Sequence, residues 1–323
     1  MNRTHVAVIF GGMSSEHSIS CLSAANVVAA IDRERFDVSG VGITPDGVWV
    51  RYGVDEILGL PSTGQLPVVE VGDRSLVSVK QMPEGTCIVD TEGNADLVQV
   101  VFPVLHGPFG EDGTIQGLLE MAGVRYVGCG VAASANCMDK HLTKMILAEA
   151  GVLVGPYVVV RDHEWREDRN AVLKAASRLE YPLFVKPARG GSSIGISKVM
   201  SPDRLEAAIE VAREHDNKVL IEQGIRGREI ECSVLDGHHG AAPRASVPGE
   251  IVVHDPDGFY DFEAKYLSGE QKASVQARAK LDDEIRNRVQ KVAIKAFRVL
   301  GGEGLARIDT FVAPDGTVYV NEP

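Results

Sequence analysis

The sequence lacks the features that mark three common classes of protein. Its five cysteines are scattered and include no C-x-x-C pair, so neither a disulfide framework nor a zinc site is indicated. No apolar run approaches the roughly 20 residues of a membrane-spanning helix, and no leader cleavage site follows the first residues. The formal net charge is -12 and no lysine or arginine run appears, which argues against a nucleic-acid partner. We therefore expect a cytoplasmic protein that binds neither nucleic acid nor membrane.

A third glycine is missing where a dinucleotide-binding loop would need it. The apolar run 5–10 ends in Gly11-Gly12, and helical spacing follows over 18–31, which predicts a β-loop-α unit. The loop "GGMSSEHS" does not complete G-x-G-x-x-G, so a Rossmann dehydrogenase is disfavoured. Further strands and a helix up to residue 128 predict an open α/β sheet. Residues 54–94 show no clear period, and we expect them to be an insertion in this domain.

The 323 residues, 44% of them hydrophobic, suffice for two or three domains. A helix is predicted from Asp139 to a C-cap at Gly151, and Pro156 opens a new strand. We therefore predict an α/β and α+β protein. An N-terminal open α/β sheet domain (1–138) precedes two lobes, 139–225 and 226–323.

The stretch "YPLFVKPARGGSSIGISKV" places Lys186 at the end of an apolar run, before a loop of glycine and serine. Small side chains leave backbone N–H groups accessible, and with a cation and hydroxyls they form an anion-binding concavity. The lysine precedes the glycines, so the loop is not a Walker loop, and a strand-loop-strand hairpin fits better. A phosphate site is the hypothesis, and a hairpin tip without a ligand is the alternative.

Two carboxylates and an arginine are predicted to converge near residue 323. Asp309 and Glu322 lie on two strands that can pair as a hairpin around Asp315-Gly316, and Arg307 shares a face with Asp309. Carboxylates that share a cation suit Mg²⁺, with Mn²⁺ as the alternative, because Mg²⁺ takes a few carboxylates plus phosphate oxygens. Solvated surface charges are the other interpretation. Upstream, Glu222 and Glu229 could accept hydrogen bonds from an adenosine, or could simply be solvated.

The order of these motifs resembles the ATP-grasp superfamily, and within it the D-alanine:D-alanine ligases, notably actinobacterial members. The resemblance covers nearly the whole chain, through "VIFGGMSSEHSIS", "VFPVLHGPFGEDGTIQGLLE", "GCGVAASANCMDK", "FVKPARGGSSIGISKV", "FYDFEAKYLSG", "LARIDTFV" and "NEP". It implies a two-lobed ATP-grasp after the N-terminal domain, with ATP, Mg²⁺ and D-alanine as ligands. We also expect a homodimer.

The resemblance implies a role for each matching position. The phosphates of ATP would be held by Lys140, Lys186, Gly191, Ser192 and Ser193, and its adenosine by Glu222, Gln223, Ile225 and Glu229, with Lys265 as a further ATP contact. Many relatives have lysine at position 223, which puts that side-chain contact in doubt. Asp309 and Glu322 match metal ligands, Arg307 the arginine beside an acyl phosphate, and Glu16 and His106 the site of the first D-alanine. Ser192 and Tyr266 match a hydrogen-bonded set with Glu16.

The implied activity is peptidoglycan precursor synthesis by ATP-dependent ligation of two D-alanines through a D-alanyl phosphate. Residues 255–272 are expected to form a lid that keeps water from that intermediate. A D-alanine:D-lactate or D-alanine:D-serine ligase is the first alternative, which "EAKYLSG" disfavours, and a regulator without ligase chemistry is the second. The resembling ligases continue beyond the position of Pro323 to an asparagine metal ligand and a Pro-Gly turn, so we expect a truncated chain, with an inactive ATP-binding form as the further alternative.

Overall fold

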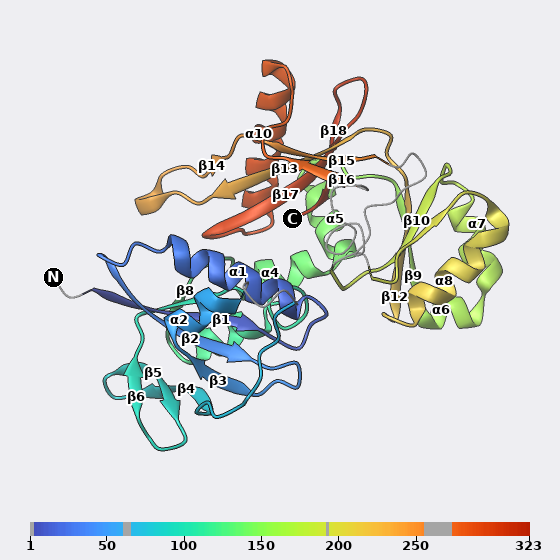
Figure 1. Ribbon diagram of the computed structural model, residues 1–323. Coiled ribbons are helices and arrows are strands. Elements are labelled where there is room, and N and C mark those ends of the chain that lie inside the picture. Colours follow the sequence, from blue (N-terminus) through green and yellow to red (C-terminus); the bar gives the residue numbers. More distant parts are fainter. Residues whose placement is uncertain (1–2, 61–65, 192–193, 255–272) are drawn as a thin grey trace. The chain divides into compact units, whose positions relative to one another are not determined.

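The computed structural model describes residues 3–60, 66–191, 194–254 and 273–323 (Figure 1). The chain divides into two compact units, residues 1–135 and 136–323. Within the described ranges, no helix has both the length and the apolar character that crossing a membrane requires.

The first unit contains a five-stranded sheet in the order β3-β2-β1-β7-β8. Its strands are β1 (Thr4–Gly11), β2 (Phe36–Ile43), β3 (Trp49–Tyr52), β7 (Val100–Pro103) and β8 (Arg125–Tyr126). All neighbouring pairs are parallel except β2 with β3. The predicted open α/β sheet is confirmed.

Helices cover both faces of this sheet. They are α1 (His17–Ala30), α2 (Val54–Gly59) and α3 (Thr114–Met121), and α4 (Val131–Met138) follows β8. Alternate residues of β1 enter two hydrophobic clusters: Ala7 and Ile9 pack with residues of α3, whereas Val8 and Phe10 pack with residues of α1 and α2. Because both faces are buried, β1 is a continuous apolar run. Its carboxyl end at Gly11 delivers the loop before α1 to the edge where ligands bind in such sheets.

The stretch 54–94 has more structure than its pattern indicated. Besides α2 it contains β4 (Val77–Met82) and β5 (Gly85–Asp90), which pair with β6 (Ala95–Leu97) in a small antiparallel sheet. Four successive residues of β5, 86–89, are buried, so this strand lacks the alternation that reveals a strand in sequence. Helix α4 was not predicted either, because its alanines, serine and asparagine give no clear apolar stripe.

Gly11 is a position that only glycine fits. Its φ is +85°, and an added Cβ would lie 2.3 Å from the carbonyl oxygen of Ile43 and 2.9 Å from Cγ2 of Val69. We expect Gly11→Ala to lower the free energy of unfolding by roughly 3 kcal/mol, from the left-handed conformation plus the backbone clash. Gly93→Ala is the matched control, because Gly93 has a φ of +90° and no atom within 4 Å of the added Cβ. Denaturant unfolding of both variants should differ, and equal losses would contradict the clash.

The second unit begins with helix α5 (Lys140–Glu149) and a four-stranded antiparallel sheet in the order β11-β10-β12-β9. The strands are β9 (Tyr157–Arg161), β10 (Leu183–Pro187), β11 (Ser197–Val199) and β12 (Lys218–Gln223). Strands β10 and β11 pair antiparallel, which confirms the strand-loop-strand hairpin around the glycine-serine loop.

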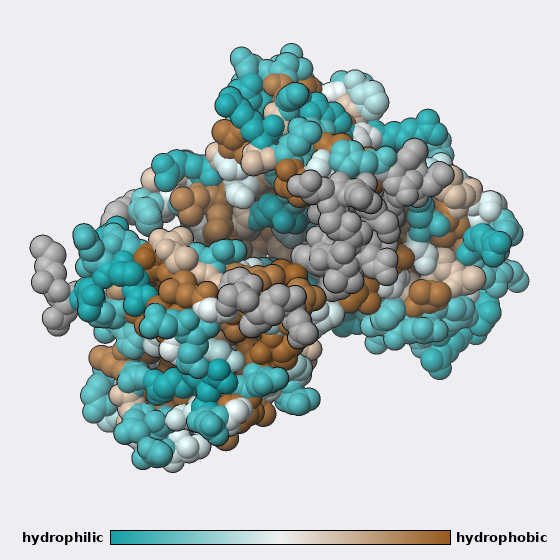
Figure 2. All heavy atoms as spheres, viewed as in Figure 1, coloured by the Kyte–Doolittle hydropathy of each residue, from teal (hydrophilic) through white to brown (hydrophobic). Residues whose placement is uncertain are grey.

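Three helices pack on one face of this sheet (Figure 1), and their outer surface is mostly hydrophilic (Figure 2). They are α6 (Asp162–Glu167), α7 (Arg169–Ala176) and α8 (Leu205–Arg213). Between β9 and β10 the helical stretch is broken at Asp168. The Asp168 carboxylate accepts a hydrogen bond from the Ala171 N–H (3.0 Å) and starts a new helix.

A six-stranded sheet completes the second unit. Its path is β16-β15-β13-β17-β18, with β14 paired to β13; the strands are β13 (Arg228–Leu235), β14 (Arg244–Ala245), β15 (Gly249–Val253), β16 (Ala273–Gln276), β17 (Leu305–Val312) and β18 (Val318–Glu322). Helix α10 (Asp283–Val299) packs on it with part of α5. The hairpin of β17 and β18 is confirmed, whereas the lobe boundary at residue 225 stays a prediction.

Candidate active site

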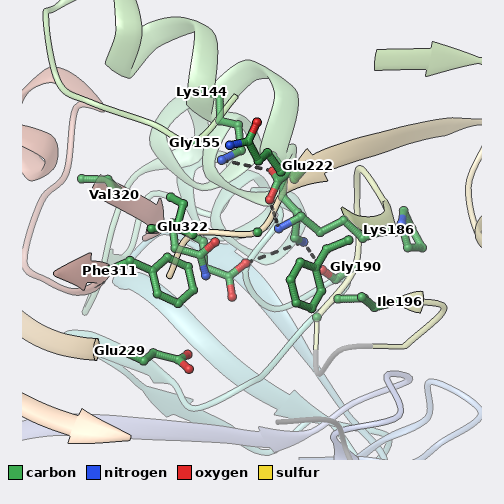
Figure 3. Close-up of a pocket in the computed structure, with 18 of the residues that line it drawn as sticks. Lys144, Gly155, Lys186, Gly190, Ile196, Glu222, Glu229, Phe311, Val320 and Glu322 are labelled. Carbon is green, nitrogen blue, oxygen red and sulfur yellow. Dashed lines mark hydrogen bonds and ion pairs between the residues drawn. The ribbon is translucent and has the colours of Figure 1, made fainter. Parts of the chain in front are cut away.

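The second unit contains a pocket that is bordered by α5, β10 and β12 on one side and by β13, β17 and β18 on the other (Figure 3). Of the predicted ATP-binding and metal residues, it brings together Lys140, Lys186, Gly191, Glu222, Gln223, Ile225, Glu229 and Glu322. Ser192, Ser193, Lys265 and Tyr266 lie outside the described residues, so their predicted roles stay predictions.

Glu222 lies between two buried lysines. Its Oε2 is 2.6 Å from Nζ of Lys186, and its Oε1 is 3.1 Å from Nζ of Lys144 (Figure 3). Lys186 and Glu222 come from the paired strands β10 and β12, and Lys144 from α5. The three side chains are 2 to 10% exposed. The predicted strand-end lysine is therefore buried in an ion pair with Glu222.

Burial and charge act in opposite directions on these groups. Burial by itself would raise the pKa of Glu222, but the two lysines outweigh it and hold that pKa below the usual range. Burial also disfavours the charge of Lys186, yet the negative charges of Glu222 and Glu322 prevail and raise its pKa. For Lys144 burial prevails over the attraction of Glu222, and its pKa is lowered.

Lys140 lies at the start of α5, next to the glycine-serine loop. Its Nζ donates a hydrogen bond to the carbonyl oxygen of Gly190 (2.7 Å) and is 3.8 Å from Oε2 of Glu322. Asp139 caps the helix by accepting from the N–H groups of His141 and Leu142 (3.1 and 3.2 Å). The cap fixes the first turn of α5, and with it the position of Lys140 beside the loop.

The other part of the pocket has apolar walls, formed by Phe184, Ile196, Phe311 and Val320. Apolar walls of this kind suit the flat ring of a nucleotide base. Glu229 borders the same space and lies opposite Phe311 in the pairing of β13 with β17.

Gln223 turns its side chain away from the predicted adenine contact. Its Oε1 accepts from the Glu180 N–H (3.0 Å), while its own N–H donates to Pro156 O (2.9 Å). The Gly224 N–H donates to Pro182 O (2.8 Å). Both backbone amides therefore already donate to carbonyl oxygens of the protein. Glu222 is the better placed group for a contact to adenine.

The two predicted metal ligands are register partners, Asp309 on β17 and Glu322 on β18. Arg307 donates two hydrogen bonds of 2.7 Å to the Asp309 carboxylate, a pairing that was not predicted from the sequence. Burial raises the pKa of Asp309 to about 6, against the pull of Arg307.

The donor chemistry fits a divalent ion of the Mg²⁺ type. Two carboxylates are few enough to leave coordination positions for phosphate oxygens and water, as Mg²⁺ prefers. Across the described ranges, no cluster of three or more His, Cys, Asp or Glu side chains could hold a metal ion by itself.

In the first unit, Glu16 and His106 lie at the carboxyl ends of the parallel strands β1 and β7. Glu16 is buried against Gly107, where an added Cβ would lie 2.5 Å from its Oε2. Ser14 Oγ donates to His106 O (2.7 Å), and Ser23 Oγ lies 3.0 Å from His106 Nε2. The structure thus brings the two predicted substrate residues to one edge of the sheet.

Two residues at these sites were not predicted from the sequence, Lys144 and Ser23. Lys144 follows Lys140 by four positions on a predicted helix, which places both ammonium groups on one face. That spacing could have identified it. Nothing in the local sequence distinguishes Ser23 from the other serines near it, because its partner His106 is 83 residues away.

Two family models match the chain: D-ala D-ala ligase N-terminus over residues 5–129 and D-ala D-ala ligase C-terminus over residues 146–323. The chain belongs to the D-alanine–D-alanine ligase family. A ligase of that name from Arthrobacter sp. (strain FB24) is 50% identical, over 99% of this chain and 85% of the relative. One from Mycobacterium sp. (strain JLS) is 49% identical, over 99% and 87%. The recognised resemblance, including its actinobacterial members, and the fold class are confirmed.

Solved structures of the family have the same fold. The D-alanine-D-alanine ligase from Coxiella burnetii aligns with a TM-score of 0.84 at 31% identity, over 100% of this chain and 84% of that one. The VanG D-Ala:D-Ser ligase from Enterococcus faecalis aligns with a TM-score of 0.82 at 35% identity, over 99% and 90%. The fold therefore accommodates ligases whose names give different second substrates.

Proposed function

We propose that this chain is an ADP-forming ligase that joins two D-alanine molecules at the expense of ATP, for cell-wall precursor synthesis. The observation that carries the proposal is the pocket in which buried lysines flank Glu222 beside the paired carboxylates Asp309 and Glu322. Membership of the ligase family supports it. Mg²⁺ as the metal, the cytoplasm as the location and a homodimer as the assembly are parts of the same proposal.

In the first step the γ-phosphoryl group is transferred from ATP to the carboxylate of the first D-alanine, and ADP leaves. Lys140 and Lys186 hold the phosphates by charge, and Glu222 accepts from the exocyclic amine of adenine. Asp309 and Glu322 would hold a divalent ion such as Mg²⁺, which would neutralise charge on the phosphate oxygens. Glu16 binds the ammonium of the first D-alanine and His106 its carboxylate.

In the second step the amine of the second D-alanine attacks the acyl carbon, and the C–O bond to phosphate breaks. The amine loses a proton, so the products are the dipeptide and inorganic phosphate. Arg307 stabilises the acyl phosphate, and its two hydrogen bonds with Asp309 fix the guanidinium plane. The proposed lid, residues 255–272 with Tyr266, lies outside the described residues.

A substrate screen tests the assignment. ADP release and product mass should be measured with D-alanine alone and with D-serine, D-lactate or L-alanine added. We expect D-alanyl-D-alanine as the main product, with one ADP per dipeptide. D-alanyl-D-serine as the main product would favour the alternative that the Enterococcus faecalis structure represents. ADP release without any condensation product would contradict ligase activity.

Ser23→Ala tests the orientation of His106. Loss of one hydroxyl partner should raise the KM for D-alanine about fivefold, as expected for one neutral hydrogen bond of about 1 kcal/mol. The KM for ATP should not change. Ser18→Ala on the same helix is the control, and steady-state kinetics of both variants decide. A shift in the KM for ATP alone would show that His106 does not serve D-alanine.

A further inference from the structure

Lys144 is a buried cation that the proposed reaction does not use. Its side chain is 2% exposed, and it lies on the buried face of α5 with Thr143 and Leu147. A buried lysine at such a position costs desolvation free energy that a methionine or leucine would not. Lys144 borders the pocket, and its Nζ is 3.1 Å from Oε1 of Glu222.

The need for a second cation follows from the contact between Lys186 and Glu222. At 2.6 Å, Glu222 largely neutralises the ammonium that should attract the phosphates of ATP. With Lys144 on the other carboxylate oxygen, the three-residue group carries a net charge of +1 instead of zero.

The charges of the whole pocket lead to the same conclusion. Among the described residues that border it, three are cationic and three are anionic: Lys140, Lys144, Lys186, Glu222, Glu229 and Glu322. Without Lys144 this set would be net negative. An excess of negative charge in a partly desolvated pocket repels a polyphosphate.

We propose that Lys144 is a positioning and charge-balancing residue, which binds Glu222 from the far side and so leaves the charge of Lys186 available to the phosphates of ATP. It does not itself contact the phosphates. The inference rests on the proposed function, because it takes the pocket to be the ATP site. The proposal predicts that loss of the Lys144 charge weakens the binding of a ligand in proportion to the negative charge of that ligand.

The test compares Lys144→Met with the unaltered protein in the binding of ATP, ADP and adenosine, measured by calorimetry at fixed Mg²⁺ and ionic strength. Methionine keeps a linear side chain of similar size and removes the charge. We expect the Kd for ATP to rise about tenfold, the Kd for ADP to rise less, and the Kd for adenosine to change by less than twofold. The KM for ATP should rise in parallel, with kcat reduced less than threefold.

Two further variants make the result decisive. Lys174→Met, on the exposed surface of α7, removes the same charge away from the pocket and should change none of these constants. Lys144→Arg should restore ATP binding to within about threefold. If Lys144→Met does not fold, as judged by thermal unfolding, Lys144→Gln keeps a donor for Glu222 without the charge and should show the same order of losses.

Equal losses for ATP and adenosine would overturn the inference, because Lys144 would then shape the adenosine site or the fold. Unchanged ATP affinity would overturn it as well. Failure of the proposed function is distinguished by the unaltered protein, which in that case would bind no ATP or form no dipeptide.

Discussion

Lys186→Met is expected to lower kcat/KM for ATP by about 1,000-fold, equivalent to about 4 kcal/mol of transition-state stabilisation. The variant loses the cation nearest to Glu222 and a charge-assisted contact to phosphate. It also leaves Glu222 buried with Lys144 alone. We therefore expect the free energy of unfolding to fall by about 3 kcal/mol, as for other broken buried ion pairs.

Lys198→Met in the same hairpin is the control for Lys186→Met. Lys198 lies on β11, opposite Phe184 of β10, and does not border the pocket. Its loss should change kcat/KM by less than threefold. Initial rates of ADP release, with ATP binding measured separately, give the comparison. ATP binding within threefold of the unaltered protein in a folded Lys186→Met variant would place the phosphates elsewhere.

Asp309→Asn is expected to reduce dipeptide formation by about 1,000-fold at a Mg²⁺ concentration that saturates the unaltered protein. The change removes one of the two carboxylates that fit the metal and weakens the hold on Arg307. We expect the Mg²⁺ concentration at half-maximal rate to rise at least tenfold. The affinity for adenosine should not change.

Asp315→Asn is the matched control for Asp309→Asn. Asp315 lies in the turn of the same hairpin, where its carboxylate accepts from the Thr317 N–H (2.9 Å), and an asparagine oxygen can do the same. A rate within twofold is expected. A Mg²⁺ titration of both variants separates the two roles of Asp309. A lower rate with an unchanged Mg²⁺ dependence would assign Asp309 to the orientation of Arg307 and contradict the metal role.

Local sequence patterns were sufficient to predict those helices and strands whose own residues show apolar periodicity or capping. The strand at 5–10 and the helix that ends before Gly151 were predicted closely, because apolar periodicity and capping depend on neighbouring residues. The hairpin around Asp315-Gly316 also follows from a short turn, but the pairing of Asp309 with Glu322 depends on a register shift between Asp309 and Thr310. For the same reason the glycine-serine loop could be predicted beside Lys186.

The motif order by itself determined the family, the reaction class and most pocket residues, since each motif is contiguous in the chain. Tertiary structure alone decided how these residues pair. It placed Lys144 of α5 on Glu222 of β12, 78 positions away, and Ser23 beside His106. It also placed Lys186, which was predicted as a cation at a strand end, in a buried ion pair with Glu222. Such pairings depend on which strands and helices pack together, and no local periodicity encodes the distance between charges that meet only after folding.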